Sequence, residues 1–295
     1  MPRDESKPKA SIGTIPGVRI DLKVDGMERS AYFYLPKKNL LSKFPLVMVL
    51  HGGLGNAENV ARMTGMNLKA EQEGFAVCYP NGSGDVGASA FTWNAWNCCG
   101  YANEHAIDDV AFMRQLVHFL ETNYPIDPTK IFLTGFSNGA MLCHKIAVQL
   151  GDKIAAIAPV AGALNATPQP IGPAVPVLMI HGLDDLHVQI AGGIPKRTFA
   201  PSQRVDKPLS HAIQYWVSRN QCAKQPEKQS LGRMQRDIYT GSGNRNLVEV
   251  CLIEGQGHSW PGSQQGLHYG NIDAPVQDVV ATDLIWKFFK GLIDS

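Results

Sequence analysis

The stretch "TGFSNG", residues 134–139, places a serine between two glycines at the point where an apolar run gives way to a helical pattern. The run "KIFL" precedes it and "AMLCHKIAVQL" follows it. A strand that turns sharply into a helix can present a serine hydroxyl above a sheet, and small residues two positions away on either side permit the strained backbone. The stretch therefore predicts that Ser137 is a nucleophile. The simpler alternative is a serine that caps a helix.

The rest of the chain alternates apolar, strand-like runs with helical patterns. The expected strands cover 45–50, 75–80, 130–135, 154–162, 175–182 and 247–255, and the expected helices lie near 57–73, 106–123, 207–219 and 277–292, with another from residue 138. The strand runs are apolar throughout, which is typical of strands buried on both faces. "VRIDLKV" and "RSAYFYLP" flank Asp25 and Gly26 and predict an N-terminal antiparallel hairpin. The sequence predicts an α/β fold with a mostly parallel central sheet flanked by helices and no large lid domain.

The chain shows no repeat and no insertion long enough for a second domain. We expect residues 1–15 to form a flexible N-terminal segment and residues 16–295 to form a single catalytic domain. In the helix expected at 106–123, apolar side chains recur every three or four residues and form one stripe that packs on the sheet. Asp108 and Asp109 near its start are expected to complement the helix dipole rather than to take part in catalysis.

The composition argues against two classes of partner. The 27 basic and 26 acidic side chains include no dense Lys/Arg run, so neither nucleic acid nor an anionic membrane surface is expected as a partner. No apolar segment reaches the roughly 20 residues that cross a bilayer. The polar start "MPRDESKPKASIG" resembles a mature N-terminus. We therefore expect a secreted protein that has lost its leader, with a cytoplasmic protein as the alternative.

The cysteine spacing fits no zinc motif. The six cysteines stand at positions 78, 98, 99, 143, 222 and 251. A disulfide between Cys222 and Cys251 is the favoured pairing, and Cys143 with either Cys98 or Cys99 is the second. The first cysteine, in "FAVCY", is expected to be a buried thiol. Six reduced thiols in a cytosolic protein remain the alternative.

A nucleophilic serine needs a base, and the base needs an acid that orients it. "MIHGLDDLHV" places two candidate acids just after a buried strand. Asp185 is preferred, and Asp184 is expected to cap the following turn. "IEGQGHSWPG" places His258 in a glycine-rich loop after the last strand. The resulting order of serine, aspartate and histidine is that of the α/β-hydrolase fold.

Three other histidines compete with His258 for the role of base. His181 and His187 lie in the loop of the acid, and His268 has no strand immediately before it. The glycines beside His258 allow its loop to bend so that the imidazole can reach Ser137. Metal-dependent hydrolysis through His181 and His187 is disfavoured, because their spacing is not that of a metal site. No metal or other cofactor is expected.

Acyl transfer also needs donors for the oxyanion. The run "VLHGGLGN", residues 49–56, resembles the His-Gly-Gly loops that supply one backbone N–H, and the residue after the nucleophile supplies another. These positions predict Gly53 and Asn138 as the two donors, with Leu54 as a neighbouring alternative to Gly53. His51 is expected to brace the loop by hydrogen bonding.

Several motifs in a fixed order carry a resemblance to a known family. "LHGG", "DDVAF", "GFSNGAM", "APVAG", "HGLDD" and "GHSWPG", together with a "W-N" and "CCG" pair, extend over about residues 30–290. The chain resembles the polyhydroxybutyrate depolymerase-like and feruloyl esterase group of α/β-hydrolases, in carbohydrate esterase family one. The resemblance implies that Ser137, Asp185 and His258 form the family triad, that Trp260 lines the cleft, and that the substrates are plant cell-wall esters or polyesters. One departure is "LHVQIAGG" after Asp185, where relatives more often have "PVVPY".

The tryptophans of the loops bear on the substrate. Trp93, Trp96 and Trp260 are expected at one end of the sheet, where aromatic faces suit a ferulate ring or a sugar. The alternative for the first two is that they anchor their loop by packing. We therefore expect a serine esterase, and we favour a feruloyl esterase acting on a small-molecule or polysaccharide ester. An acetylxylan esterase, a polyhydroxyalkanoate depolymerase and a non-catalytic carbohydrate-binding protein are the alternatives.

Overall fold

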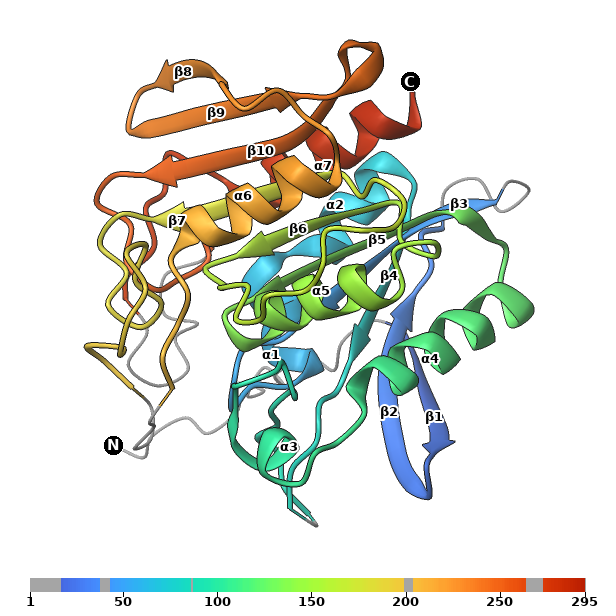
Figure 1. The fold of residues 1–295 in the computed structure, drawn as a ribbon. Coiled ribbons are helices and arrows are strands. Elements are labelled where there is room, and N and C mark those ends of the chain that lie inside the picture. Colours follow the sequence, from blue (N-terminus) through green and yellow to red (C-terminus); the bar gives the residue numbers. More distant parts are fainter. Residues whose placement is uncertain (1–16, 38–42, 86, 199–203, 264–272, 295) are drawn as a thin grey trace, which may run out of the picture.

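The computed structural model describes residues 17–37, 43–85, 87–198, 204–263 and 273–294, and the expected flexible segment 1–15 lies outside them. Ten strands form one sheet in the order β1-β2-β4-β3-β5-β6-β7-β10-β9-β8 (Figure 1). The strands are β1 (Val18–Val24), β2 (Met27–Tyr34), β3 (Phe44–Leu50), β4 (Ala76–Pro80), β5 (Ile126–Phe136), β6 (Ala156–Val160), β7 (Val177–Gly182), β8 (Glu227–Leu231), β9 (Met234–Thr240) and β10 (Asn246–Ile253). The helices are α1 (Ala57–Thr64), α2 (Met66–Glu73), α3 (Gly100–Glu104), α4 (Asp109–Asn123), α5 (Asn138–Gln149), α6 (Leu209–Arg219) and α7 (Ala281–Ile293), with a short 3₁₀ turn, η1 (Ser242–Asn244).

The centre of the sheet is parallel, as predicted. Strands β4, β3, β5, β6, β7 and β10 pair in parallel, whereas antiparallel hairpins extend both ends of the sheet. At one end β1 and β2 form the expected hairpin around Asp25 and Gly26, and β2 pairs antiparallel with β4. The fold prediction is therefore confirmed: a mixed, mostly parallel sheet lies between layers of helices.

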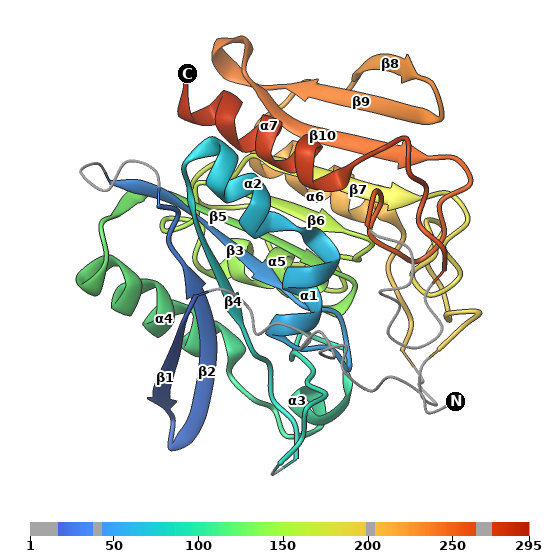
Figure 2. The ribbon, with the colours of Figure 1, turned by 180° about the vertical axis from the view of Figure 1, so that it is seen from behind.

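Helices cover both faces of the sheet and create two cores. Helices α4, α5 and α6 lie on one face (Figure 1), and α1, α2 and α7 lie on the other (Figure 2). Within β3, Met48 and Leu50 belong to the first core, whereas Val47 and Val49 belong to the second. Alternate side chains of one strand thus enter opposite cores, which explains why the central strands are apolar throughout. Among the described residues, no helix is long and apolar enough to cross a membrane.

Three elements differ from the expectations. The helix expected at 57–73 is two helices, because Gly65 adopts a left-handed conformation with φ 60° and ends α1. The helix expected at 106–123 begins at Asp109, and the side chain of Asp108 caps it by accepting a hydrogen bond from the N–H of Ala111 at 2.9 Å. The hairpin of β8 and β9 was not expected, because β8 is short and largely exposed and β9 carries polar side chains among its buried ones.

The predicted disulfide between Cys222 and Cys251 is wrong. Cys251 points into the core beside α7, whereas Cys222 packs against the core on the opposite face of the sheet. Both are free, as is Cys143, so the second predicted pairing is also wrong. The structure instead pairs the adjacent Cys98 and Cys99 across a cis peptide bond. The thiol in "FAVCY" is buried and free, as expected.

Candidate active site

The turn between β5 and α5 holds Ser137 in a strained backbone conformation. Its φ of 54° and ψ of −117° lie outside the regions that side chains ordinarily adopt. The serine N–H donates a hydrogen bond to the carbonyl of Val160 in β6 at 3.0 Å, which fixes the turn to the neighbouring strand. The strained conformation that the sequence predicted at this strand-to-helix junction is therefore present, and it directs the hydroxyl away from the sheet.

The two glycines flanking Ser137 are required by close backbone contacts. A Cβ atom on Gly139 would lie 2.4 Å from the carbonyl oxygen of His51, and one on Gly135 would lie 2.8 Å from the carbonyl carbon of Gly139. Both separations are below any normal contact distance, so only glycine fits at either position. These contacts bring the start of α5 against the loop that follows β3.

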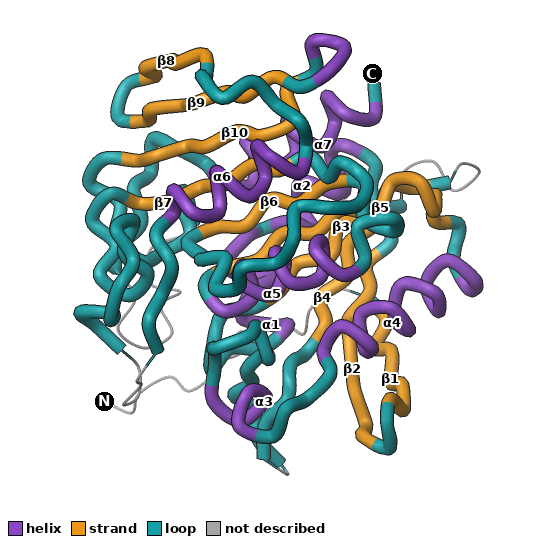
Figure 3. The backbone as a smooth tube through the Cα atoms, in the orientation of Figure 1, coloured by secondary structure: helices purple, strands orange, loops and turns teal. Residues whose placement is uncertain are grey.

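Ser137, His258 and Asp185 form a continuous line of hydrogen bonds. The hydroxyl of Ser137 donates to Nε2 of His258 at 2.9 Å, and Nδ1–H of His258 donates to Oδ2 of Asp185 at 2.7 Å. The loops that carry the acid and the imidazole follow β7 and β10, which are neighbouring parallel strands, and Figure 3 shows these loops together at one end of the sheet. The structure thus brings together the three side chains that were predicted as a triad.

The carboxylate of Asp185 is buried and fully engaged. Its Oδ1 accepts the N–H groups of His187 and Val188, each at 2.8 Å. Burial alone would raise the pKa of Asp185, but the neighbouring His258 and these hydrogen bonds outweigh burial, and its pKa lies below the ordinary value. The carboxylate is therefore charged. Asp184, the alternative acid, is exposed to solvent.

Two residues that the sequence analysis did not identify hold the loop of His258. Asp273 accepts the backbone N–H of His258 at 2.8 Å through Oδ2, and a Cβ atom on Gly257 would collide with this carboxylate. Gln256 donates to Ser259 Oγ at 2.6 Å and accepts the N–H of Val276 at 3.0 Å. The motif "GQGHSW" contained the glutamine, but nothing in the sequence indicated that Asp273 returns to this loop.

The rival histidines take other positions. Nε2–H of His181 donates to the carbonyl of Val188 at 2.6 Å, and burial lowers the pKa of this imidazole. His187 packs its ring against that of His258, with 4.8 Å between the ring centres. His268 lies outside the described residues. Of the two rivals that the structure describes, His187 lines the same pocket as Ser137.

The predicted oxyanion donors flank the serine. Gly53 and Asn138 line one pocket together with Ser137. The N–H of Asn138 is the first of α5, so no carbonyl of the preceding turn of that helix can accept it. Leu54, the alternative to Gly53, has a left-handed φ of 62° and an exposed side chain.

His51 braces the first donor loop, as expected. Its Nδ1–H donates to the carbonyl of Gly52 at 2.7 Å, and its Nε2 accepts the N–H of Gly82 at 2.9 Å. Burial lowers the pKa of His51 to about 4, so the ring is neutral and can serve as donor at one nitrogen and acceptor at the other. The loop that contains Gly53 is thereby tied to the segment after β4.

The pocket at Ser137 has a volume of about 620 Å³ and a lining of mixed polar and apolar side chains. One wall comes from the loops after β7 and includes His187, Arg197 and Arg204. The facing wall comes from the segment around α3 and includes Asn97 and Asn103. The described residues of the lining include no Phe, Tyr or Trp. The lining thus combines hydrogen-bonding groups with apolar side chains such as Leu54, Val188 and Val205.

Comparison with known proteins fits this geometry. A protein family described as "Esterase PHB depolymerase" matches residues 29–193. The chain belongs to this family. The protein NocK of Nocardia uniformis subsp. tsuyamanensis is 28% identical over 266 residues, which cover 84% of this chain and 74% of NocK. A feruloyl esterase B of Piromyces equi is 28% identical over 227 residues, which cover 73% of this chain and 39% of that protein.

The fold has close counterparts among solved esterase structures. An acetyl xylan esterase from Aspergillus awamori superimposes with a TM-score of 0.64 and 16% identity, covering 94% of this chain and all of that one. An S-formylglutathione hydrolase from Agrobacterium tumefaciens superimposes with a TM-score of 0.57 and 10% identity, covering 93% of this chain and 94% of that one. At this identity the likeness establishes the α/β-hydrolase fold and nothing finer.

The tryptophans that were expected to line the cleft of this esterase do not do so. Trp93 and Trp260 are 0% and 1% exposed, and the indole N–H groups donate inward, to the carbonyl of His51 and to Thr282 Oγ1. Trp96 is half-buried against the core and does not line the pocket. The burial of Trp93 and Trp260 argues against a substrate-binding role for these two residues, and the role expected for Trp96 stays a prediction. Trp93 and Trp260 act as packing anchors.

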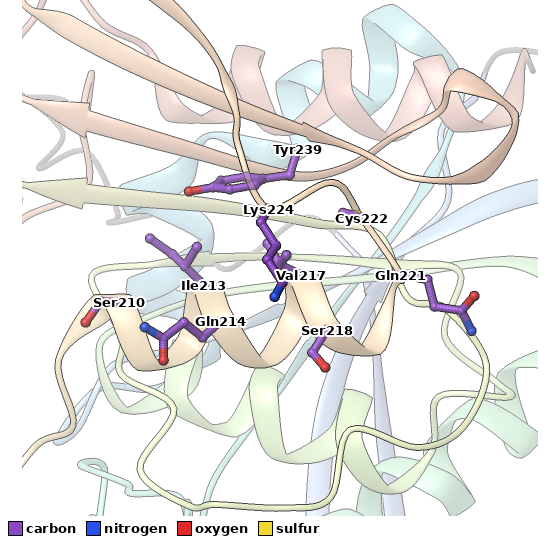
Figure 4. A pocket seen from close by; sticks show the side chains of 9 residues that line it. All are labelled: Ser210, Ile213, Gln214, Val217, Ser218, Gln221, Cys222, Lys224 and Tyr239. Carbon is purple, nitrogen blue, oxygen red and sulfur yellow. The ribbon is translucent and has the colours of Figure 1, made fainter.

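A second hollow in the structure lies apart from the triad. This open hollow of about 620 Å³ lies between α6 and β9, where Ile213 and Val217 approach Tyr239 (Figure 4). None of its lining residues belongs to the pocket at Ser137.

In the part of the chain that the structure describes, no cluster of His, Cys, Asp and Glu side chains is arranged to hold a metal ion.

Proposed function

We propose that the chain is a serine carboxylic-ester hydrolase that works through an acyl-enzyme. The observation that carries the proposal is the line of hydrogen bonds from Ser137 through His258 to Asp185, with distances of 2.9 and 2.7 Å, at the wall of an open pocket. In this arrangement the imidazole, oriented by the charged carboxylate, can remove the proton of the serine hydroxyl as the serine attacks the ester carbonyl. Membership of an esterase family supports the same reaction.

The reaction begins when Ser137 Oγ attacks the ester carbonyl. Nε2 of His258 accepts the hydroxyl proton, and Asp185 stabilises the resulting imidazolium and holds its tautomer. The backbone N–H groups of Gly53 and Asn138 bind the negative oxygen of the tetrahedral intermediate. His258 returns the proton to the departing alcohol. A water molecule then attacks the acyl-enzyme by the same route, releasing the acid and restoring the serine.

For the substrate we favour a small acyl group on a polar alcohol, such as an acetylated polysaccharide. Exposed polar side chains line the pocket, among them Asn97, Arg197 and Thr198, and such groups suit sugar hydroxyls. A feruloyl ester, favoured by the sequence, is now the alternative, because the tryptophans that suggested it are buried. Relatives bear the names acetylxylan esterase, feruloyl esterase B and poly(3-hydroxybutyrate) depolymerase.

Two further expectations of the sequence analysis remain proposals, one on location and one on domain organisation. A polysaccharide substrate of this kind lies outside the cell, so secretion stays our prediction, with the cytoplasmic alternative open. Residues 16–295 are proposed to act as one catalytic domain, because the triad draws on loops after β5, β7 and β10, which belong to one sheet.

Covalent trapping tests the proposal. A fluorophosphonate should add one label to the protein, detected by intact mass, and peptide mapping should place it on Ser137. Ser137→Ala should lose both the label and the hydrolysis of p-nitrophenyl acetate. If Ser137→Ala keeps its activity, the proposed mechanism is wrong. If the wild type binds xylan but hydrolyses no ester, the non-catalytic carbohydrate-binding alternative is correct.

A rate comparison then identifies the ester. Initial rates on acetylated xylan, methyl ferulate and hydroxybutyrate oligomers are measured with one preparation, standardised by fluorophosphonate titration. The proposed substrate class requires kcat/KM for acetylated xylan to exceed the other two. A preference for methyl ferulate would instead support the alternative that the sequence favoured.

A further inference from the structure

We infer that Arg204 is a positioning residue of the active site. Its guanidinium joins the loop that carries the catalytic acid to the loop that supports the second oxyanion amide. The inference rests on the proposed function and deepens it, because it concerns how the same site is held in its reactive geometry. Sequence motifs did not single out Arg204.

The guanidinium of Arg204 is held by hydrogen bonds from two of its nitrogens and by an ion pair at the third. Nη2 donates to the carbonyl of His187 at 2.8 Å, and Nη1 lies 3.3 Å from Cys98 Sγ and 3.6 Å from Cys99 Sγ. Nε forms an ion pair with Asp206 Oδ1 at 2.9 Å. The arginine side chain is only 13% exposed and lines the pocket. Partners on three sides hold the planar group in one orientation.

On the acid side, Arg204 acts through His187. The carbonyl of His187 accepts from Arg204, while its N–H donates to Oδ1 of Asp185 at 2.8 Å. The ring of the same residue packs on that of His258 with ring centres 4.8 Å apart. A shift of His187 would therefore move the hydrogen-bond donor of the acid and the surface on which the base rests.

On the oxyanion side, Arg204 acts through the cysteine pair. Cys98 Sγ accepts a weak hydrogen bond from Nδ2 of Asn138 at 3.6 Å. The backbone of this segment is also held to the arginine segment, since the side chain of Asn97 donates to the carbonyl of Val205 at 2.9 Å. The arginine thus bears on the residue whose N–H is proposed to bind the oxyanion.

Asp206 makes this arrangement stable. Its side chain is 1% exposed, and its Oδ1 also accepts from Nδ2 of Asn165 at 2.8 Å. Its backbone exchanges two hydrogen bonds with Gly193, at 2.8 and 2.9 Å. A cation in the lining of the pocket that contains His258 would otherwise disfavour the imidazolium that forms during the reaction, and the paired carboxylate offsets that charge. Arg204 therefore supplies geometry more than charge.

Variants at Arg204 separate geometry from charge. Arg204→Ala removes both, and Arg204→Lys keeps the charge but cannot form the planar fork. We expect kcat on p-nitrophenyl acetate to fall about 100-fold in Arg204→Ala and about 10-fold in Arg204→Lys, since displacements near 1 Å cost rates of that order. KM should change less than about threefold. Arg19→Ala, which breaks an exposed pair with Asp21, is the matched control.

Chemical rescue gives a readout that a purely structural role would not move. Guanidinium ion, added far below its denaturing range, should partly restore kcat to Arg204→Ala by occupying the vacated site, and should not raise kcat of the wild type or of Arg204→Lys. All rates are expressed per fluorophosphonate-reactive site, so that unfolded protein is not counted. If Arg204→Ala does not fold, Arg204→Lys decides the question through the same ratio of kcat to reactive sites.

Three outcomes overturn the inference. The first is a kcat per reactive site that equals the wild-type value in both Arg204→Lys and Arg204→Ala. The second is a loss in Arg204→Ala that guanidinium does not restore at all. The third is a change confined to KM, which would make Arg204 a substrate-binding group instead. Failure of the proposed function is a separate result, because it would appear as full activity in Ser137→Ala.

Discussion

The side-chain amide of Asn138 binds both backbone polar groups of Trp93. Its Oδ1 accepts the tryptophan N–H at 2.7 Å, and its Nδ2 donates to the tryptophan carbonyl at 3.0 Å. The indole N–H of Trp93 in turn donates to the carbonyl of His51 at 2.9 Å. The residue that begins α5 is therefore connected, through a buried tryptophan, to the loop that carries the first oxyanion donor. The two donors proposed for the oxyanion share one support.

Replacing Asn138 by alanine should test this support. The variant keeps the backbone N–H but leaves the buried N–H of Trp93 without its partner, while the Trp93 carbonyl still accepts the N–H of Cys99 at 3.0 Å. The free energy of unfolding should therefore fall by about 1–3 kcal/mol. Because the amide is displaced rather than removed, kcat should fall about tenfold, less than for a deleted oxyanion donor. Urea unfolding and p-nitrophenyl acetate kinetics measure both effects, with the surface change Asn123→Ala as control. An unchanged kcat would show that the side chain of Asn138 does not position the oxyanion amides.

The two neighbouring aspartates allow a matched pair of variants. Asp185→Asn should reduce kcat by roughly 10³- to 10⁴-fold, because an amide facing Nδ1 of His258 favours the wrong imidazole tautomer. Asp184→Asn should leave kcat within about twofold of the wild type, since this side chain is exposed. The measurement is kcat per titrated serine for each variant. Equal losses in both variants would contradict the assignment of the acid.

Trp260→Ala separates packing from substrate binding. The ring is 1% exposed, and its N–H donates to Thr282 Oγ1 at 3.1 Å, so its loss should cost about 3–5 kcal/mol of unfolding free energy. KM for acetylated xylan and methyl ferulate should change less than about twofold where folded protein persists. Trp260→Phe should recover part of the stability. A large rise in KM for either ester would show instead that Trp260 contributes to substrate binding.

Much of the fold and of the candidate site could be predicted because it is encoded locally. The apolar runs of the central strands reflect burial on both faces, and the glycines around Ser137 reflect contacts that exclude a side chain. The acid and the base follow the strands after which the sequence placed them. These features depend on residues close together in the chain, so their pattern is visible without a structure.

The wrong or missing predictions concern the direction in which side chains point and the contacts between residues that lie far apart in the sequence. A tryptophan in a cleft loop can point outward or inward, and only the structure shows that Trp93 donates inward to His51. The faces to which Cys222 and Cys251 point likewise depend on strand register and on how α6 crosses the sheet. The contact of Arg204 with Cys98 joins residues 106 positions apart, and no local pattern marks it.

Buried neutral histidines should make the fold sensitive to acid. Burial lowers the pKa of His51 to about 4 and that of His144 to about 3, whereas an unfolded histidine titrates near 6.5. Below about pH 6.5 the unfolded chain therefore binds more protons, so the free energy of unfolding falls as the pH falls toward these values. The contribution of His51 alone would be about 3 kcal/mol, fully present above about pH 6.5.

His144→Gln isolates one of these contributions. Nδ1 of His144 accepts the indole N–H of Trp216 at 3.0 Å, and the carbonyl oxygen of glutamine can accept the same donor without titrating. The free energy of unfolding of the variant should fall less steeply than that of the wild type between about pH 6.5 and pH 4. Urea titrations at several pH values measure the slope. Parallel slopes would show that His144 does not contribute to the acid sensitivity.

The buried ion pair of Arg29 and Asp109 links fold stability to the active-site loop. Nη2 of Arg29 lies 2.7 Å from Oδ1 of Asp109, and both side chains are almost fully buried. The other carboxylate oxygen accepts the N–H of Asn94 at 2.7 Å, next to Trp93. Asp109 therefore does more than complement the dipole of α4, the role expected from the sequence. It also anchors the loop that Asn138 binds.

Arg29→Met and Asp109→Asn should consequently differ. Arg29→Met leaves a buried carboxylate without its cation and should cost about 3–5 kcal/mol at neutral pH. Burial already raises the pKa of Asp109, and loss of the arginine raises it further, so the protonated carboxyl is tolerated better. The stability deficit of Arg29→Met should therefore shrink as the pH falls toward about 5. Its kcat per reactive site should fall less than that of Asp109→Asn, whose amide can displace Asn94. If the loss of unfolding free energy in Arg29→Met does not depend on pH, protonation of Asp109 does not compensate for the missing arginine.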